Sequence, residues 1–402
     1  TLFQDAAGST PVTAVEQPVG RILDKSGRGN HATQATTTKR PVLSRRVNLL
    51  TKTEQFDDAV WPKSRCSVTS NAIVGPDGLM SADKVIADAQ SNPHFISATV
   101  AHKSGTTCRI SVYAKAGEWD TVMLFGANNS IGGMFDLSLG TYVANVIGLP
   151  ITPTITPVGG GWYLLALSFV ATADNQGVAI RITPSGGNSG APGNGVAGLY
   201  LWGADSRPAT DAHLPYQWVN TATDYDADPS KFPAYRKLDG VDDSHASATG
   251  GGGNAGFFFS AAVTPQGGAG TARTLFSDAG TNTGYIVRLN TSNQLELAAG
   301  NGTTYTTVAT SGTLAVGTTD IVQAWDDGTN LNVKIGNGAT ASIARPTVSA
   351  GTAGYTMGQD NGASTGYFNG RLYSTIYRKD SGLTQVQRES VALYQRQKAR
   401  KP

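Results

Sequence analysis

Hydrophobic and polar side chains alternate with a period of two along much of this chain. Between residues 108 and 115, Cys108, Ile110, Val112 and Ala114 alternate with mostly polar residues. Successive side chains of a β-strand point to opposite faces of a sheet, so this alternation predicts strands that bury one face. Further strand-like runs follow at 163–169, 178–182, 199–203, 285–289, 295–298, 305–308, 321–325, 331–335 and 372–376, and residues 257–259 form a continuous apolar run.

Turn residues separate these runs. Asp327-Gly328, between the runs at 321–325 and 331–335, is typical of a hairpin, because Gly adopts the left-handed conformation that a tight turn requires. Short strands joined by turns rich in Gly and Pro indicate an all-β fold made of β-sandwich or jelly-roll domains.

One helix is predicted, at about 384–398. Thr384 and Gln387 fit a capping box at its start, in which each side chain binds the backbone amide of the other residue. One face of this helix is expected to carry Val386, Ser390, Leu393 and Tyr394.

The composition agrees with a folded, β-rich chain. Its 402 residues suffice for two domains, or for three small ones, and 39% of them are hydrophobic. Only 15% are charged, while 49 are Gly and 18 are Pro. A charged fraction below the usual quarter, with abundant Gly, suits short strands and tight turns and not helices or disorder.

Cysteine content and hydropathy exclude several classes of protein. The chain has Cys66 and Cys108 but no Cys-x-x-Cys or Cys/His cluster, so zinc and redox sites are not expected. The two either form a disulfide or remain buried thiols, and we favour thiols because the chain is poor in cysteine. Apolar runs are shorter than the ~20 residues needed to cross a bilayer, so membrane insertion is not expected.

Charge is nearly balanced, with a formal net charge of +2. Basic residues gather near the C-terminus, at Arg371, Arg378, Lys379, Arg388, Arg396, Lys398, Arg400 and Lys401. Such a segment can bind nucleic acid or an acidic partner, but a run this short is more typical of a solvated helix end. A nucleic-acid partner is therefore not expected.

Two separated segments resemble halves of one known motif. Asp24–Gln34 with Lys39–Leu43 resembles the opening of LamG-like, concanavalin-type jelly rolls. In that family the next strand usually reads FDGVDD, and the similar sequence Leu238–Asp243 follows here only after a long intervening segment. Gly370–Tyr377, followed by Leu383-Thr384, is similar to the strand and helix that close the family's fold.

The intervening segment resembles a jelly roll that recurs in tail, fibre and spike proteins of tailed phages and that is similar in topology to carbohydrate-binding modules. The matching stretches are Asn48–Phe56 with Trp61, Pro76–Gly78, Ala82–Lys84, Ser111–Gly117, Phe135–Leu137, Gly161–Tyr163 and Leu201–Ala204. The resemblance implies a discontinuous LamG-like domain, 1–45 with 226–402, interrupted by an inserted module at 46–225. Insertion at an exposed loop is physically tolerable.

These resemblances imply a phage virion structural protein on the particle exterior. It would be a tail-fibre, spike or head-fibre subunit that mediates host-surface glycan adhesion or virion assembly. Its expected partners are other virion proteins and a host glycan, and similar subunits are commonly homotrimers. Two alternatives remain open: a bacterial secreted or cell-surface lectin, and a polysaccharide-degrading tailspike.

Enzymatic activity is not expected. A glycosidase needs two carboxyl groups about 5–10 Å apart. The glutamates are isolated in the sequence, at Glu16, Glu54, Glu118, Glu296 and Glu389. Residues 362–366 fit the Gly-x-Ser-x-Gly pattern of a nucleophile elbow, but that elbow requires a strand before it and a helix after it, and here a Gly-rich loop leads into a strand.

Five residues are candidate metal ligands: Asp24, Asn30, Asp239, Asp242 and Asp243. If the two halves of the LamG-like motif come together, these oxygens would gather at one edge, and Ca²⁺ takes about six to eight such oxygens. Alternatively, Asp and Asn side chains accept hydrogen bonds from backbone amides and lock tight loops. We favour the loop interpretation and expect no cofactor other than calcium.

Aromatic side chains are candidates for sugar stacking, because their faces bind the CH surfaces of pyranose rings. Trp119, Trp218 and Tyr225 are the candidate ligand-binding residues, the two tryptophans because their sequence neighbours are polar. The other tryptophans lie in apolar strand patterns and are expected in the core: Trp61, Trp162, Trp202 and Trp325.

Overall fold

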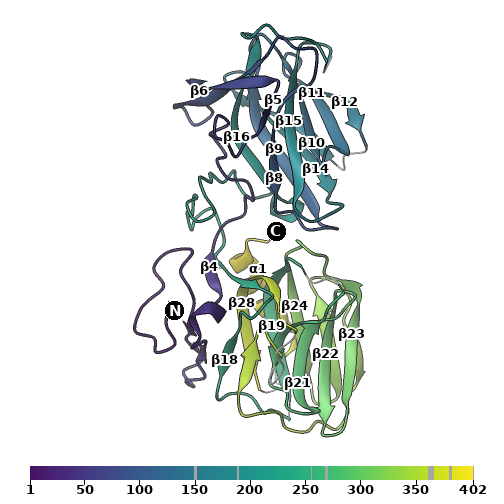
Figure 1. Ribbon diagram of the computed structural model, residues 1–402. Coiled ribbons are helices and arrows are strands. Elements are labelled where there is room, and N and C mark those ends of the chain that lie inside the picture. The colour runs from purple at the N-terminus through teal and green to yellow at the C-terminus, as the bar shows by residue number, and fades with distance from the viewer. Residues whose placement is uncertain are drawn as a thin grey trace. The chain divides into compact units, whose positions relative to one another are not determined.

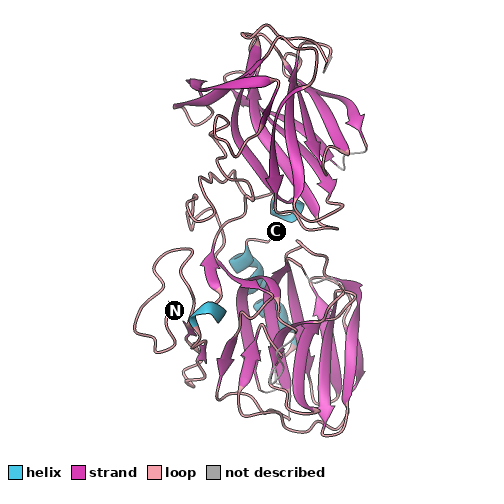
Figure 2. Cartoon of the chain, viewed as in Figure 1, coloured by secondary structure: helices cyan, strands magenta, loops and turns pink. Residues whose placement is uncertain are grey.

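The computed structural model describes residues 1–148, 152–187, 190–254, 256–267, 270–360, 366–379 and 383–401. These residues form two compact units, Thr1–Arg45 with Pro229–Pro402, and Arg46–Asp228. Strands dominate both units (Figures 1 and 2). The fold is all-β, as predicted: two jelly-roll β-sandwiches, one inserted into the other, and a short C-terminal helix.

The discontinuous unit consists of two antiparallel sheets. One has the order β1 (Leu2–Phe3), β2 (Arg21–Ile22), β3 (Ala32–Thr33), β18 (His245–Ser247), β27 (Tyr355–Met357), β20 (Arg273–Ser277), β21 (Thr283–Leu289), β22 (Gln294–Asn301) and β23 (Tyr305–Thr313). The other has the order β26 (Ala341–Ala344), β25 (Asn330–Ile335), β24 (Asp320–Asp326), β19 (Phe257–Pro265), β28 (Asn369–Arg378), β17 (Tyr235–Asp239) and β4 (Val42–Ser44). A 3-10 turn, η1, spans Thr37–Lys39.

Backbone pairing joins the two separated parts of this unit. Ser44 of β4 lies opposite Tyr235 of β17, and Thr33 of β3 lies opposite Ala246 of β18. The buried His245 adds a hydrogen bond of 2.8 Å between its Nε2 and the carbonyl of Val19. Residues 21–45 therefore pair in the same two sheets as strands from 238–380, as expected for one domain interrupted by an insertion.

Aromatic rings fill the core between these two sheets. Phe257 and Phe259 of β19 are fully buried, and the Phe257 ring stacks on Tyr285 with centroids 4.7 Å apart. The predicted hairpin is also present, because β24 and β25 pair across the Asp327-Gly328 turn and Gly328 has a φ of 88°. Alternation along each strand places every second side chain in this core.

The helix α1 (Gln385–Ala399) begins with the predicted capping box of Thr384 and Gln387. Val386, Ser390, Leu393 and Tyr394 share one face of the helix, as expected, and this face is exposed. The packed face instead carries Ala392, Gln395 and Ala399, because the sheet beneath offers a polar contact at Ser260 and small apolar side chains beside it.

The inserted unit also has two antiparallel sheets. One has the order β12 (Thr141–Ile147), β11 (Ile131–Asp136), β10 (Thr121–Gly126), β15 (Gln176–Thr183), β8 (His94–Val100) and β5 (Lys63–Ser64). The other has the order β13 (Thr152–Gly159), β14 (Trp162–Val170), β9 (Thr107–Lys115), β16 (Gly198–Pro208), β7 (Met80–Ala87) and β6 (Cys66–Val74). A 3-10 turn, η2, spans Ala209–Asp211.

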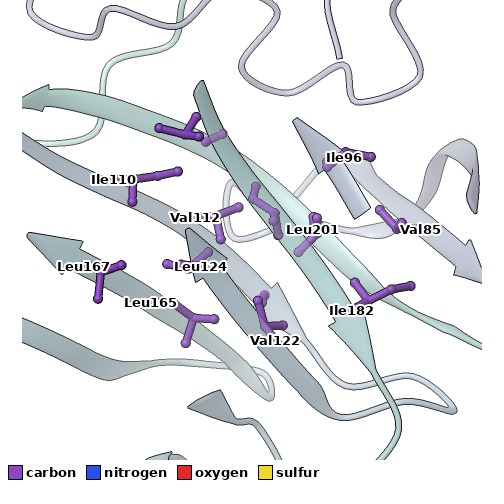
Figure 3. Packing of buried hydrophobic residues seen from close by; sticks show 14 of the residues in the cluster. Val85, Ile96, Ile110, Val112, Val122, Leu124, Leu165, Leu167, Ile182 and Leu201 are labelled. Atoms are coloured by element: carbon purple, nitrogen blue, oxygen red, sulfur yellow. The ribbon is translucent and has the colours of Figure 1, made fainter. Parts of the chain in front are cut away.

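Aliphatic side chains from both sheets meet in the core of the inserted unit (Figure 3). Val112 and Leu165 come from one sheet, and Leu124 and Ile182 from the other, as the alternation predicts. The four tryptophans expected in cores are buried: Trp61 in this core, Trp162 and Trp202 in a smaller cluster of the same unit, and Trp325 on β24 of the discontinuous unit.

Cys66 and Cys108 are free thiols, as favoured from the sequence, with Cys108 buried and Cys66 half-buried. Burial raises the pKa of Cys66 to about 11 and that of Cys108 to about 12, so both stay protonated at neutral pH. Among the described helices, none combines the length and apolar composition needed to cross a membrane.

Candidate functional site

A polar pocket of about 330 Å³ opens on the inserted unit. One aromatic side chain, Trp218, lies among its lining residues. The others are polar or acidic: Glu54, Gln55, Asp57, Asp58, Ser70, Asn71, Ser81 and Asp83. We refer to this site as the Glu54–Trp218 pocket.

Two hydrogen bonds between Thr53 and Val219 bring Glu54 and Trp218 together. The amide of Thr53 donates to the carbonyl of Val219 over 3.0 Å, and the amide of Val219 donates to Thr53 Oγ1 over 3.0 Å. Glu54 and Trp218 are the direct neighbours of this pair in sequence. Two segments far apart in the chain are thus fixed side by side, and both side chains line one pocket.

Glu54 is the carboxyl group with the most unusual environment in the pocket. Burial raises its pKa from the ordinary 4.5 to about 7, and the nearby charges of Asp77 and Asp83 act in the same direction. The Tyr216 hydroxyl donates to Oε1 of Glu54 over 3.1 Å and opposes the shift. Near neutral pH the carboxyl group therefore exists in both forms and can donate as well as accept a hydrogen bond.

Asp83 holds the walls of the pocket together. Its two carboxylate oxygens accept hydrogen bonds from the amides of Phe56, at 2.8 Å, and Asn71, at 2.9 Å. Asn71 has a left-handed φ of 51°, and its exposed side chain lies on the pocket rim. Because both oxygens of Asp83 bind backbone amides, this residue has a structural role.

Asp58 is also engaged within the protein. Its Oδ1 accepts a hydrogen bond from the amide of Val60, which lowers its pKa, and Lys52 lies 3.6 Å from Oδ2 and lowers it further. The side chain of Asp57 is exposed on the same pocket wall. Glu54 and Asp57 are therefore the pocket carboxyl groups most open to a ligand.

The three aromatic candidates occupy different environments. Trp218 is half-exposed in the pocket. Trp119 is only 7% exposed and packs edge-to-face against His94, so its expected surface position is wrong: neighbouring charged residues turn outward while the indole turns into the core. Tyr225 is also 7% exposed.

The candidate metal ligands fall into two groups. Carboxylate oxygens of Asp239, Asp242 and Asp243 lie within 4.8 Å of one another. However, Asp239 Oδ1 accepts a hydrogen bond from the amide of Val241, at 2.8 Å, and Asp243 Oδ2 accepts one from the amide of Asp239, at 3.0 Å. These contacts fit the loop-locking interpretation, and burial raises the pKa of Asp243 to about 6.

Asp24 and Asn30 belong to a second group, in the loop before β3. Asp24 accepts hydrogen bonds from the amides of Ser26, at 2.7 Å, and Asn30, at 3.1 Å. Both line a groove of about 660 Å³ whose walls include Tyr355 and Tyr377. Four cations also line this groove: Lys25, Arg28, Arg378 and Lys379.

Of the nucleophile-elbow pattern at 362–366, only Gly366 lies within the part of the chain that the structure describes. The basic C-terminal residues are largely engaged within the protein. Arg371 is buried, Lys401 lies 2.7 Å from Asp320, and the guanidinium of Arg388 stacks 4.5 Å from the ring centroid of Trp325.

No protein-family model and no curated protein matches this sequence. Among solved structures, domains LG4-5 of the mouse laminin alpha1 chain align with 79% of this chain and 94% of their own, at 10% identity and a TM-score of 0.31. Carbohydrate binding module CBM66 from Bacillus subtilis aligns with 36% of this chain and 83% of its own, at 10% identity and a TM-score of 0.24. Trypanosoma rangeli sialidase in complex with sialic acid aligns with 96% and 72%, at 10% identity and a TM-score of 0.30. Similarities of this size establish no ligand and no activity for this chain.

Proposed function

We propose that this chain is a non-catalytic glycan-binding protein and that the Glu54–Trp218 pocket is its binding site. The observation that carries the proposal is the half-exposed indole of Trp218 in a pocket whose other walls are polar. An aromatic face binds the CH surface of a sugar ring, while surrounding polar groups bind its hydroxyls.

The chemistry of the pocket matches a neutral saccharide. Glu54 near its pKa of about 7 can accept or donate a hydrogen bond, and the exposed side chains of Asn71 and Asp57 add further donors and acceptors. The pocket volume of about 330 Å³ lies at the lower end of the range for small-ligand sites, which suits one or two sugar rings.

A hydrolase is the second candidate, and Glu54 is the observation that favours it. A carboxyl group that keeps its proton near neutral pH is what a general acid requires. Hydrolysis also requires a second carboxylate that can act as nucleophile or general base. The carboxylates of Asp83 and Asp58 instead accept hydrogen bonds from backbone amides. Asp57 is the remaining candidate partner, and we favour binding over hydrolysis.

We further propose a phage particle exterior as the setting, with a homotrimer and contacts to other virion proteins. The sequence resemblance to tail, fibre and spike modules supports this setting. The edge strand β12 supports assembly: it carries no charged residue, and Val143, Val146 and Ile147 are exposed on it. Edge strands of monomers are commonly protected by charge. Light scattering of the purified chain should give the trimer mass, and a stable monomer would contradict the trimer.

The binding proposal is tested by titrating the chain with oligosaccharides from host surfaces and assaying new reducing ends. Trp218→Ala should weaken binding about tenfold or more, as loss of a stacked aromatic residue does at binding sites. Glu54→Gln should weaken it less, because the amide keeps a donor and an acceptor. Leu139→Ala and Glu118→Gln, both exposed and outside the pocket, serve as matched controls.

Two outcomes would contradict the proposal in different ways. Reducing ends that appear with the native chain and disappear with Glu54→Gln would establish hydrolysis in place of simple binding. If Trp218→Ala binds the glycan with unchanged affinity, the glycan binds at another place on the chain.

A further inference from the structure

Arg181 lies on the outer face of one sheet of the inserted unit. Its neighbour Ile182 on β15 points into the core (Figure 3), and successive side chains alternate, so Arg181 points outward. Its cross-strand partners are Met123 on β10 and Phe95 on β8. The guanidinium carbon lies 4.4 Å from the ring centroid of Phe125 and 5.9 Å from that of Phe95.

The guanidinium of Arg181 has no anionic partner among the described residues. Its Nε is buried without a hydrogen-bond acceptor, and no carboxylate lies within ion-pair distance. Other arginines of this chain pair with acids: Arg207 with Asp205, and Arg288 with Glu296. Burial alone lowers the pKa of Arg181, and no neighbouring negative charge offsets it.

An unpaired, half-buried cation is unfavourable for the free protein. A buried donor without an acceptor destabilises the folded protein, because it has lost its hydrogen bonds to water. The ring faces of Phe125 and Phe95 attract the cation and offset part of this destabilisation, but they do not accept hydrogen bonds from all the N–H groups of the guanidinium. An oxyanion that reached Arg181 would satisfy two donors at once, because carboxylate and guanidinium match as a planar fork.

A groove of about 240 Å³ lies on the same sheet face, next to Phe95. Phe95 lines it and also contacts Arg181. Its floor is formed by small residues, including Ser97 and Gly177, which lie on the strands β8 and β15. A ligand can therefore approach the sheet backbone closely next to Arg181.

Two asparagines form the rim of this groove. Ala127, Asn128 and Asn129 all have left-handed φ angles, of 50°, 54° and 63°. Asn128 Oδ1 accepts a hydrogen bond from the amide of Gly177 over 2.6 Å, which fixes its carboxamide and leaves the Nδ2 hydrogens as donors. Asn129 is exposed beside it. Fixed amide donors next to a hydroxyl at Ser97 suit a polyhydroxylated ligand.

We propose that this face is a second, separate binding site, for an acidic saccharide whose carboxylate binds Arg181 and whose ring lies in the groove lined by Phe95, Ser97 and Asn128. The proposal does not depend on the Glu54–Trp218 pocket. A sulfate or phosphate ester on a neutral sugar would present the same oxyanion chemistry, so both kinds of ligand belong in the test.

The experiment is calorimetric titration of the full chain with a uronic-acid oligosaccharide, its carboxyl-reduced neutral form and a sulfated neutral oligosaccharide. The native chain should bind the uronic acid about tenfold or more tightly than the reduced form. If the sulfated sugar binds more tightly than the uronic acid, the site recognises a sulfate, and the proposal of a carboxylate ligand is wrong. No binding of either acidic ligand would overturn the site.

Arg181→Met separates a binding role from a structural one. It should lose about tenfold or more in affinity for the uronic acid while its melting temperature stays equal or rises, because an unsatisfied cation is replaced by an apolar side chain. Trp218→Ala should leave this binding unchanged. Lys115→Met, on the other sheet, is the control for loss of a positive charge.

Two results would contradict the assignment of Arg181. If Arg181→Met binds the uronic acid like the native chain, the cation is not the recognition group. If it melts at a markedly lower temperature, Arg181 serves the fold through its contacts with Phe125.

Discussion

At the scale of single residues, burial controls the protonation of Glu54. Its pKa is raised to about 7 in the folded chain, so folding favours the protonated form. A raised folded-state pKa stabilises the fold fully below the unfolded value of 4.5, and this contribution is lost as the pH rises through about 7.

Glu54→Gln should therefore make stability less dependent on pH between about 4.5 and 7, measured as the free energy of urea unfolding. Asp243 and Asp278, whose pKa values are raised to about 6, titrate in the same range, so the dependence should flatten and not vanish. Glu389→Gln, at an exposed carboxylate on α1, is the control. An unchanged profile in Glu54→Gln would show that Glu54 is ionised in the folded chain.

The sequence indicated Trp218 as a candidate ligand-binding residue, but it gave no reason to select Glu54, which has no other glutamate near it in a catalytic spacing. Glu54 precedes the strands of its unit, and its pocket partners Asn71 and Asp83 follow on β6 and β7, so only the folded sheet brings them together. Polar neighbours in sequence also misled the prediction for Trp119, since adjacent residues face opposite ways. The sequence did not indicate Arg181, because the fold determines whether a side chain has an ion-pair partner.

At the scale of elements, alternation was a reliable guide to strands. The predicted runs at β9, β14 and β24 are present, because each buries one face in a sandwich core. The helix α1 was located correctly by its capping box, but the sequence did not indicate which of its faces packs against the sheet. That face carries Gln395, a polar residue that hydrophobic periodicity does not detect.

Gln395 should anchor α1 to its sheet. It is fully buried, its Nε2 donates to the carbonyl of Ser260 over 2.9 Å, and the Ser260 hydroxyl donates to its Oε1. Gln395→Ala leaves these groups of Ser260 unsatisfied and should lower the free energy of unfolding by about 1–3 kcal/mol. Gln397→Ala, exposed on the same helix, should change it little. Equal effects of the two variants would mean that Gln395 does not anchor the helix.

At the scale of the whole molecule, the two parts of the discontinuous unit pair directly with each other. Ser44 lies opposite Tyr235 in the pair of β4 and β17, so the chain leaves and re-enters this unit at neighbouring points. Replacing residues 46–228 by a linker of about four Gly and Ser residues would join β4 to β17 through a loop that also contains Arg45 and residues 229–234, and loops of this length cost little extra entropy to close.

This excised chain should fold and unfold cooperatively, with a far-ultraviolet circular dichroism spectrum typical of β-structure. The matched comparison is a chain of residues 229–402 alone, which lacks β1 to β4, so that β17 and β18 each lose one of their two partner strands. It should be markedly less stable or insoluble. An excised chain that stays unfolded would show that the inserted unit is needed for folding.

The pairing of β4 with β17 also has a consequence for synthesis on the ribosome. About 180 residues separate the two parts of the discontinuous unit, which at about 5–20 residues per second takes roughly 10–40 s to translate. The inserted unit is local in sequence and can complete its sandwich in that time, while β3 and β4 wait for their later partners, β18 and β17. The nascent chain is thus most vulnerable to aggregation and proteolysis at its oldest end, where a ribosome-associated chaperone would have the longest opportunity to bind.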